Sequence, residues 1–172
     1  MTIAKPKPGD YAPLYQKYLD AASSVDNAHD LLAQQADVLA FMTTWPEEKA
    51  TQRYAEGKWT VAQVIGHMAD TERVFAYRLL RIARGDATPL AGFDENAFQL
   101  QAGFTGRTVA SLVAELRAVR QSSLALIRSL DDEALDRAGT ASDARVTARA
   151  LVWLMAGHFA HHTAILKQRY GL

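Results

Sequence analysis

The chain has 172 residues, 49% of them hydrophobic, with no cysteine and a formal net charge of zero. This length predicts one domain, and so many apolar residues supply a core that needs no disulfide or structural metal in order to fold. The sequence excludes disulfides, thiolate ligands and a cysteine nucleophile; it has no basic stripe for nucleic acid, no apolar run of membrane-spanning length and no secretory signal, so we expect a cytoplasmic protein.

Residues 1–25 are expected to form an extended lead-in, because the prolines within it fix φ and disfavour helix. The first long helix is predicted over residues 27–44, where apolar residues recur at helical spacing. Asp26 is its expected N-cap, since a short polar side chain can accept from the free backbone N–H groups of the first turn. Pro46 ends this helix, because the residue before a proline is pushed out of helical geometry.

The second helix is predicted over residues 61–84. Thr60 and Gln63 have the spacing of a capping box, in which each side chain satisfies a free backbone N–H of the other residue, and Gly85 stops the helix. The segment 86–107 that follows is too long for a tight helical hairpin. It can cross the end of the bundle, so the second and third helices need not be antiparallel neighbours.

The third helix is predicted over residues 109–130 with Thr108 as its cap, and the fourth over residues 148–170 with Thr147 as its cap. Between them lies a polar stretch, residues 131–145, and the chain carries no strand signal of any length. Four long helices predict an all-α fold, a four-helix bundle with a long crossover between helices two and three, in a single domain that spans the whole chain.

Two histidines mark the fourth helix as a candidate metal-binding element. His158 and His162 are four residues apart, so they lie one turn apart on the same face, within the apolar stripe. That spacing suits two imidazoles on one metal ion, and burying two imidazoles together requires a reason. The alternative is that they merely pack in the core. His161 projects to another side and is the poorer ligand.

His67 lies in the second helix at the edge of its apolar face, from which it could reach the same interior space. Gly66 beside it would allow a neighbouring helix to approach closely. Helical phase alone leaves His67 as either a third ligand or an ordinary hydrogen-bonded histidine. His29, at the start of the first helix among polar residues, is interpreted as a surface residue.

Two carboxylates follow His67 in the second helix. Asp70 could orient a ligand or hold a water molecule. Glu72 falls on the apolar side, where a buried carboxylate needs a partner. Three arginines could supply it: Arg78, Arg107 or Arg120. A structural ion pair between helices is the favoured interpretation of Glu72; the alternative is a general base or substrate contact near a metal, which leaves Asp70, Glu72 and Arg78 as candidate catalytic residues.

Several motifs, taken together and in order, resemble the DinB-like (also called YfiT-like) metalloenzyme superfamily. They are Gly-Asp-Tyr-Ala-Pro at 9–13, Gly-Lys-Trp-Thr at 57–60, Val-Ile-Gly-His-Met-Ala-Asp-Thr-Glu-Arg at 64–73, Arg-Ile-Ala-Arg-Gly-Asp at 81–86, Gly-Phe-Asp-Glu at 92–95 and Ala-Gly-His-Phe-Ala-His-His at 156–162. The resemblance covers nearly the whole chain. It implies a four-helix bundle with an unusual crossover, commonly assembled as a homodimer.

The same resemblance implies one divalent metal ion held by His67, His158 and His162, with nickel or zinc as the expected metal and manganese or iron as alternatives. Characterised relatives include transferases and isomerases that use low-molecular-weight thiols. Three imidazoles leave open positions for water or substrate. We therefore expect a metal-dependent transferase, such as a thiol S-transferase, or a hydrolase acting on a small molecule; the alternative is a non-catalytic binding or stress-response module that retains the metal.

Overall fold

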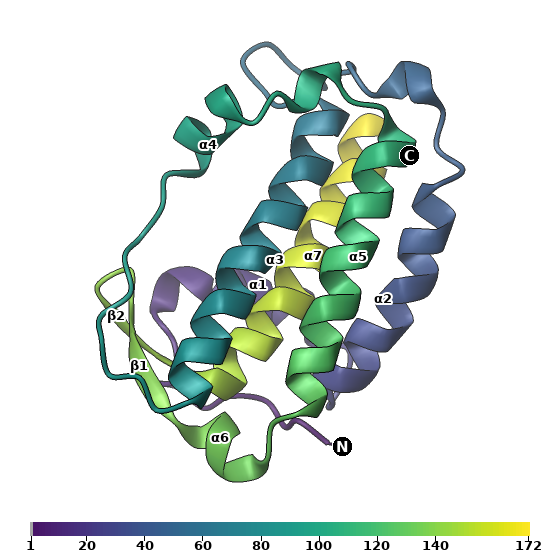
Figure 1. Cartoon of the computed structure of the whole chain (residues 1–172). Coiled ribbons are helices and arrows are strands. Elements are labelled where there is room, and N and C mark those ends of the chain that lie inside the picture. Colours follow the sequence, from purple (N-terminus) through teal and green to yellow (C-terminus); the bar gives the residue numbers. More distant parts are fainter. Residues whose placement is uncertain (1) are drawn as a thin grey trace.

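The computed structural model describes residues 2–172, and its main body is a bundle of four long helices (Figure 1). These are α2 (Ala28–Met42), α3 (Val61–Ala83), α5 (Val109–Arg128) and α7 (Ala148–Tyr170). In Figure 1, α2 and α7 run in one direction along the bundle, and α3 and α5 run in the other. Because α3 and α5 are parallel and packed side by side, the chain must return along the bundle between them. Residues 84–108 do so, which confirms the predicted crossover.

Shorter elements fill the connections. They are η1 (Pro13–Tyr15), α1 (Gln16–Ala21), η2 (Glu47–Lys49), α4 (Glu95–Gln101), η3 (Phe104–Gly106), α6 (Asp132–Asp136), β1 (Ala138–Ala141) and β2 (Ala144–Thr147). Both α4 and η3 belong to the crossover. Across the described residues, every helix is too short or too polar to cross a membrane.

The helix ends show where local sequence decides structure. The capping box of Thr60 and Gln63 is present, and Thr108 and Thr147 cap α5 and α7 as predicted. The N-cap of α2, however, is Asn27 and not Asp26. Asn27 accepts hydrogen bonds from the backbone N–H groups of both His29 and Ile3; it therefore ties the N-terminal segment to the helix, whereas Asp26 turns outward.

The N-terminal segment is more structured than an extended lead-in. The expectation for residues 1–25 is wrong over Gln16–Ala21, which form α1 and pack on α7. Tyr18 is buried there, and Ile3 is fully buried. The indole Nε1 of Trp153 donates to the carbonyl oxygens of Ile3 and Ala4 at 3.1 and 2.8 Å. Prolines prevent helix only where they stand, so the residues after Pro13 are free to form one against α7.

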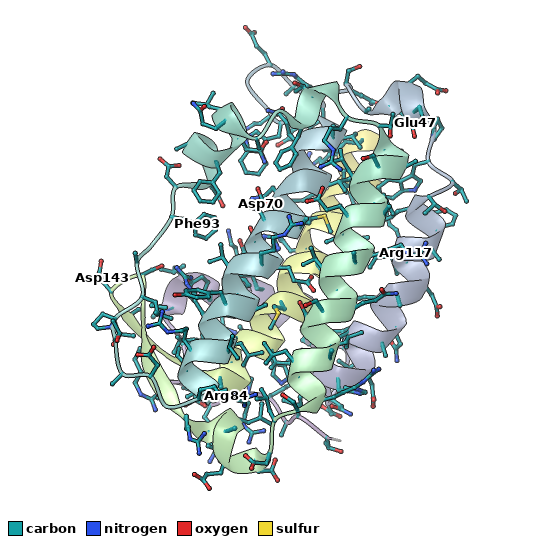
Figure 2. The ribbon with its side chains drawn as sticks, viewed as in Figure 1. Glu47, Asp70, Arg84, Phe93, Arg117 and Asp143 are labelled. Carbon is teal, nitrogen blue, oxygen red and sulfur yellow. The ribbon has the colours of Figure 1, made fainter. Side chains whose placement is uncertain are left out.

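The expectation of no strand is also wrong, because β1 and β2 form an antiparallel hairpin. Its turn uses Ser142 and Asp143, both with positive φ of 52° and 60°, as a two-residue hairpin turn requires; Asp143 is labelled in Figure 2. The strands are short and rich in alanine, so they lack the usual strand pattern. Tertiary contacts select them: Gly139 leaves room for Ile82, and the N–H of Leu90 donates to the Thr140 carbonyl.

A buried polar layer crosses the middle of the bundle. Arg120 of α5 donates from Nε and Nη2 to the two carboxylate oxygens of Glu72 in α3, at 2.8 Å each. Its Nη1 donates to Gln35 of α2 at 2.7 Å, and Gln35 donates to the carbonyl oxygen of Ala156 in α7 at 2.8 Å. All four long helices are therefore joined by one chain of hydrogen bonds. Of the three arginines considered, Arg120 is the partner of Glu72.

Two glycines let other segments approach the helices that carry histidines. A Cβ on Gly157 of α7 would lie 1.9 Å from the carbonyl oxygen of Tyr18, so α1 can pack there only against a glycine. A Cβ on Gly66 of α3 would lie 2.5 Å from the ring of Phe104. The close approach expected at Gly66 thus comes from an aromatic side chain of the crossover.

Removing one member of the buried ion pair should destabilise the fold strongly. We expect Glu72→Gln to lower the free energy of unfolding by about 3–5 kcal/mol, because the Arg120 guanidinium is then buried without a counter-charge. The double variant Glu72→Leu with Arg120→Met should lose less than the single variant, since no charge is left unpaired. Urea denaturation measures both changes.

The matched control is Glu133→Gln, which breaks the exposed pair with Arg137 and should change stability by less than about 1 kcal/mol. A Glu72→Gln protein as stable as this control would contradict the structural role of the buried pair.

Candidate metal centre

Three histidines converge between α3 and α7. The Nε2 atoms of His67 and His158 are 3.0 Å apart. One ring nitrogen from each of His67, His158 and His162 lies within 4.8 Å of the others, a grouping that could hold a metal ion. His67 and His158 are only 4% and 3% exposed, and His162 is slightly more open. His67 lies at the edge of the apolar face of α3, and it is buried because the crossover covers that side.

The surroundings of His67 orient its ring. Nδ1 lies 3.4 Å from the hydroxyl oxygen of Thr71, one turn further along α3. If Nδ1–H donates to this oxygen, Nε2 carries no proton and offers its lone pair toward His158. The ring of Trp59 packs 4.8 Å from the ring of His67 on another side. His67 is thus held with Nε2 facing the centre of the cluster.

Burial keeps the three imidazoles neutral. It lowers the pKa of His67 to about 4 and that of His162 to about 2, and it holds the pKa of His158 well below its usual value. Repulsion from the neighbouring histidines and from Lys17 lowers the pKa of His158 and His162 further. Neutral imidazoles are the form that binds metal ions, so the cluster is ready to donate three lone pairs at neutral pH.

His161 stands apart from this group, as helical phase predicts. Its ring packs on Tyr18 at 5.4 Å and on His162 at 5.1 Å, and it does not belong to the three-nitrogen cluster. His29 lies in the first turn of α2 beside Asp30, and it is half-buried, not fully at the surface as expected.

The carboxylate and arginine candidates from the sequence lie outside the cluster. Asp70, labelled on α3 in Figure 2, pairs with Arg73 at 3.2 Å. Glu72 is held in the buried layer by Arg120. Arg78 donates to the carbonyl oxygen of Ala91 and to the Ser142 hydroxyl, at 2.8 Å each, and so ties the crossover to the hairpin. Within residues 2–172, none of the three candidates makes a polar contact with the histidine cluster.

Glu95 is the carboxylate that lies beside the cluster, and it is not among the candidate catalytic residues predicted from the sequence. It is the first residue of α4, and its Oε2 lies 3.8 Å from Nε2 of His67. Its side chain is 52% exposed. Two signals in the sequence mark this position: Glu95 ends the Gly-Phe-Asp-Glu motif at 92–95, and the capping residue Asp94 precedes it. Nothing in the spacing between residues 67 and 95 indicates that the crossover will bring them together.

Two pockets reach the cluster from different sides. One, of about 260 Å³, is lined by His158, Glu95, Tyr18, Lys17 and Phe93, among others; Figure 2 labels Phe93 on the crossover, beside α3. The other, of about 270 Å³, is lined by residues that include His162, Trp59, Asn96 and Tyr170. A larger pocket of about 460 Å³ lies under the crossover near Arg78 and does not touch the histidines. Small molecules can therefore approach the cluster.

This donor set fits a divalent metal ion. The three ring nitrogens face one another at distances that leave space for a shared ion. Because the imidazoles are neutral, an ion bound among them would not be repelled by a positive charge on them. Without an ion, such a cluster is unfavourable, because three buried nitrogen lone pairs face one another and not all of them can accept a hydrogen bond. Three nitrogen ligands with pockets on two sides match a site with open positions and not a closed structural site.

Comparison with known proteins agrees with this fold. "Putative metal-dependent hydrolase OB0413" of Oceanobacillus iheyensis is 26% identical to this chain over 123 residues, which is 70% of each protein. YfiT of Bacillus subtilis, described as "a probable metal-dependent hydrolase with an unusual four-helix bundle topology", superposes with a TM-score of 0.67 at 20% identity, over 97% of this chain and 93% of YfiT. Residues 30–166 match the DinB superfamily, and the chain therefore belongs to that superfamily.

Proposed function

We propose that this protein is a metal-dependent enzyme that holds one divalent ion with His67, His158 and His162 and acts on a small molecule. The observation that carries the proposal is the buried cluster of three neutral ring nitrogens within 4.8 Å of one another. An all-imidazole donor set suits nickel or zinc. The description of both relatives as metal-dependent hydrolases supports the same class of chemistry.

The bound ion would act as a Lewis acid and lower the pKa of a water or thiol placed beside it. The protein supplies the remaining conditions. His67, His158 and His162 offer unprotonated nitrogens, the covering segments limit water, and the two pockets admit reactants. Since the chain contains no cysteine, any thiol nucleophile must come from a second substrate.

The reaction we propose is hydrolysis or transfer of a group to a thiol. Hydrolysis is supported by the description of the relatives. Transfer is supported by the two separate pockets, one reaching His158 and the other His162, because direct transfer between two reactants requires both to be bound at once.

Metal content is the direct test of the site. We expect untagged protein to bind about one divalent ion per chain, and His158→Ala with His162→Ala to bind almost none. Removing a group that only orients a ligand weakens metal binding by roughly 10–100-fold. Removing the ligands themselves should weaken metal binding more than this. Elemental analysis after dialysis against nickel or zinc measures the content.

His161→Ala is the matched control, since it removes a neighbouring imidazole from the same helix and should retain the metal. A double variant that binds as much metal as the His161→Ala protein would refute the ligand assignment.

Catalysis needs a separate measurement. We expect metal-loaded protein to turn over a member of a panel of small esters, amides and electrophiles, offered with and without low-molecular-weight thiols. Chelator should abolish this turnover and added metal should restore it, because the ion supplies the Lewis acid. Metal binding without turnover across the panel would instead indicate a non-catalytic module that retains the metal.

The stability of the metal-free protein should depend on pH between about 6.5 and 4. Histidines of the unfolded chain have a pKa of about 6.5, whereas the folded protein holds the pKa of His67 at about 4. In this range the unfolded chain binds more protons, so acid favours unfolding, and each such histidine contributes up to about 1.4 kcal/mol per pH unit. Denaturation of chelator-treated protein at several pH values measures the slope.

His67→Gln removes one of these groups and should make the loss of stability with falling pH shallower. Equal slopes for the variant and the original protein would show that His67 is not held neutral by the fold.

A further inference from the structure

We infer that Glu95 is a catalytic residue whose carboxylate takes the proton of the nucleophile, a water or a thiol, at the open side of the histidine cluster. This inference rests on the proposed function, because it assigns a role to a residue beside the proposed metal ligands.

The position of the carboxylate is the first argument. Glu95 Oε2 is 3.8 Å from His67 Nε2, the nitrogen that faces His158 at 3.0 Å. Across residues 2–172 it is the one carboxylate within 4.0 Å of a cluster nitrogen. It does not join the compact group formed by His67, His158 and His162, so it stands beside the ligand positions instead of completing a closed four-ligand site.

The freedom of this carboxylate is the second argument. Asp70 and Glu72, the two carboxylates of α3, are held by Arg73 and Arg120. Glu95 has no lysine or arginine within 4.0 Å; its ion-pair contact is with His67. A carboxylate without a counter-cation keeps its lone pairs available for a proton from a reactant.

The crossover holds Glu95 in this place. Asp94 caps α4 through hydrogen bonds from the backbone N–H groups of Asn96 and Ala97, at 2.8 and 3.1 Å. Gln99, one turn further along, donates to the carbonyl oxygen of Gln63 in α3 at 2.9 Å. Figure 1 shows α4 beside the N-terminal half of α3, which carries His67. The short helix that carries Glu95 is therefore held at both of its ends.

Access is the third argument. Glu95 and His158 line the same pocket of about 260 Å³, together with the phenol of Tyr18. The 52% exposure of Glu95 allows it to exchange protons with solvent between turnovers. A reactant in this pocket would touch both the carboxylate and the cluster, as a group that accepts a proton in the reaction must.

The oxygen of water, or the sulfur of a thiol, forms a bond to the electrophilic atom of the substrate as its bond to hydrogen breaks. The proton passes to the Glu95 carboxylate. The bond to the leaving group then breaks with its electron pair, and the protonated Glu95 returns the proton to that group.

Proton counting tests the assignment without a known substrate. Protein loaded with Co²⁺ is titrated with acetohydroxamic acid and with 2-mercaptoethanol, two probes that lose a proton when they bind a metal. Calorimetry in buffers of different ionisation enthalpy gives the protons released per probe bound. We expect Glu95→Gln to release more protons per probe bound than the original protein, by up to about one, because its amide cannot accept a proton from the probe.

Two further variants separate the proton role from a structural one. Glu95→Asp keeps a carboxylate and should restore low proton release in part. Glu133→Gln makes the same substitution in the first turn of α6 and should release as few protons as the original protein. Co²⁺ affinity should be the same for Glu95→Gln and the original protein.

Different outcomes would overturn the proposed function and the role of Glu95. An original protein that takes up no Co²⁺ would refute the proposed function, and the role of Glu95 with it. Equal proton release by the original protein and Glu95→Gln, or failure of both probes to bind the Co²⁺-loaded protein, would refute the role of Glu95 alone. A loss of Co²⁺ affinity of about 100-fold or more in Glu95→Gln would identify Glu95 as a metal ligand and also overturn its assignment as proton acceptor.

Discussion

The buried ion pair between Glu72 and Arg120 is the constraint on which the rest of this structure depends. With Gln35 it forms a polar layer that separates two apolar clusters of the core. Buried charges are tolerated only when their hydrogen bonds are made with good geometry, so the layer fixes how far each helix can slide along its neighbours. Its last hydrogen bond reaches Ala156, two residues before His158. The register that satisfies Arg120 therefore also sets α3 and α7 so that His67 meets His158.

The direction of the helices explains how the cluster is covered. Parallel α3 and α5 require a connection that runs back along the bundle, and this crossover carries Glu95 to His67. The N-terminal segment covers the other side, where Gly157 admits the backbone of Tyr18. Both coverings bury the imidazoles, and this burial lowers their pKa values. The environment of the histidines thus follows from topology, because the crossover that the parallel helices require also covers the cluster and brings a carboxylate to it.

Two glutamates, one buried and one exposed, have different roles in the fold. Glu72 lies on the apolar side of α3 and is neutralised by Arg120, so its charge helps to join α3 to α5. Glu95 lies on a short helix of the crossover, and its carboxylate stands beside the cluster with no lysine or arginine within 4.0 Å. The difference comes from what each side chain meets after folding, and it separates a structural carboxylate from one that can take part in a reaction.

The sequence alone determined the features that depend on near neighbours. The capping box at Thr60, the caps at Thr108 and Thr147, and the shared face of His158 and His162 follow from hydrogen bonds and helical phase within a few residues. Even local rules failed where a distant segment took part: Asn27 caps α2 because it also binds Ile3. Only the tertiary structure chose Arg120 among three arginines, formed the hairpin, and placed Glu95 at His67. These outcomes depend on the path of the crossover and on the register of packed helices, which bring together residues whose separation along the chain carries no signal of their contact.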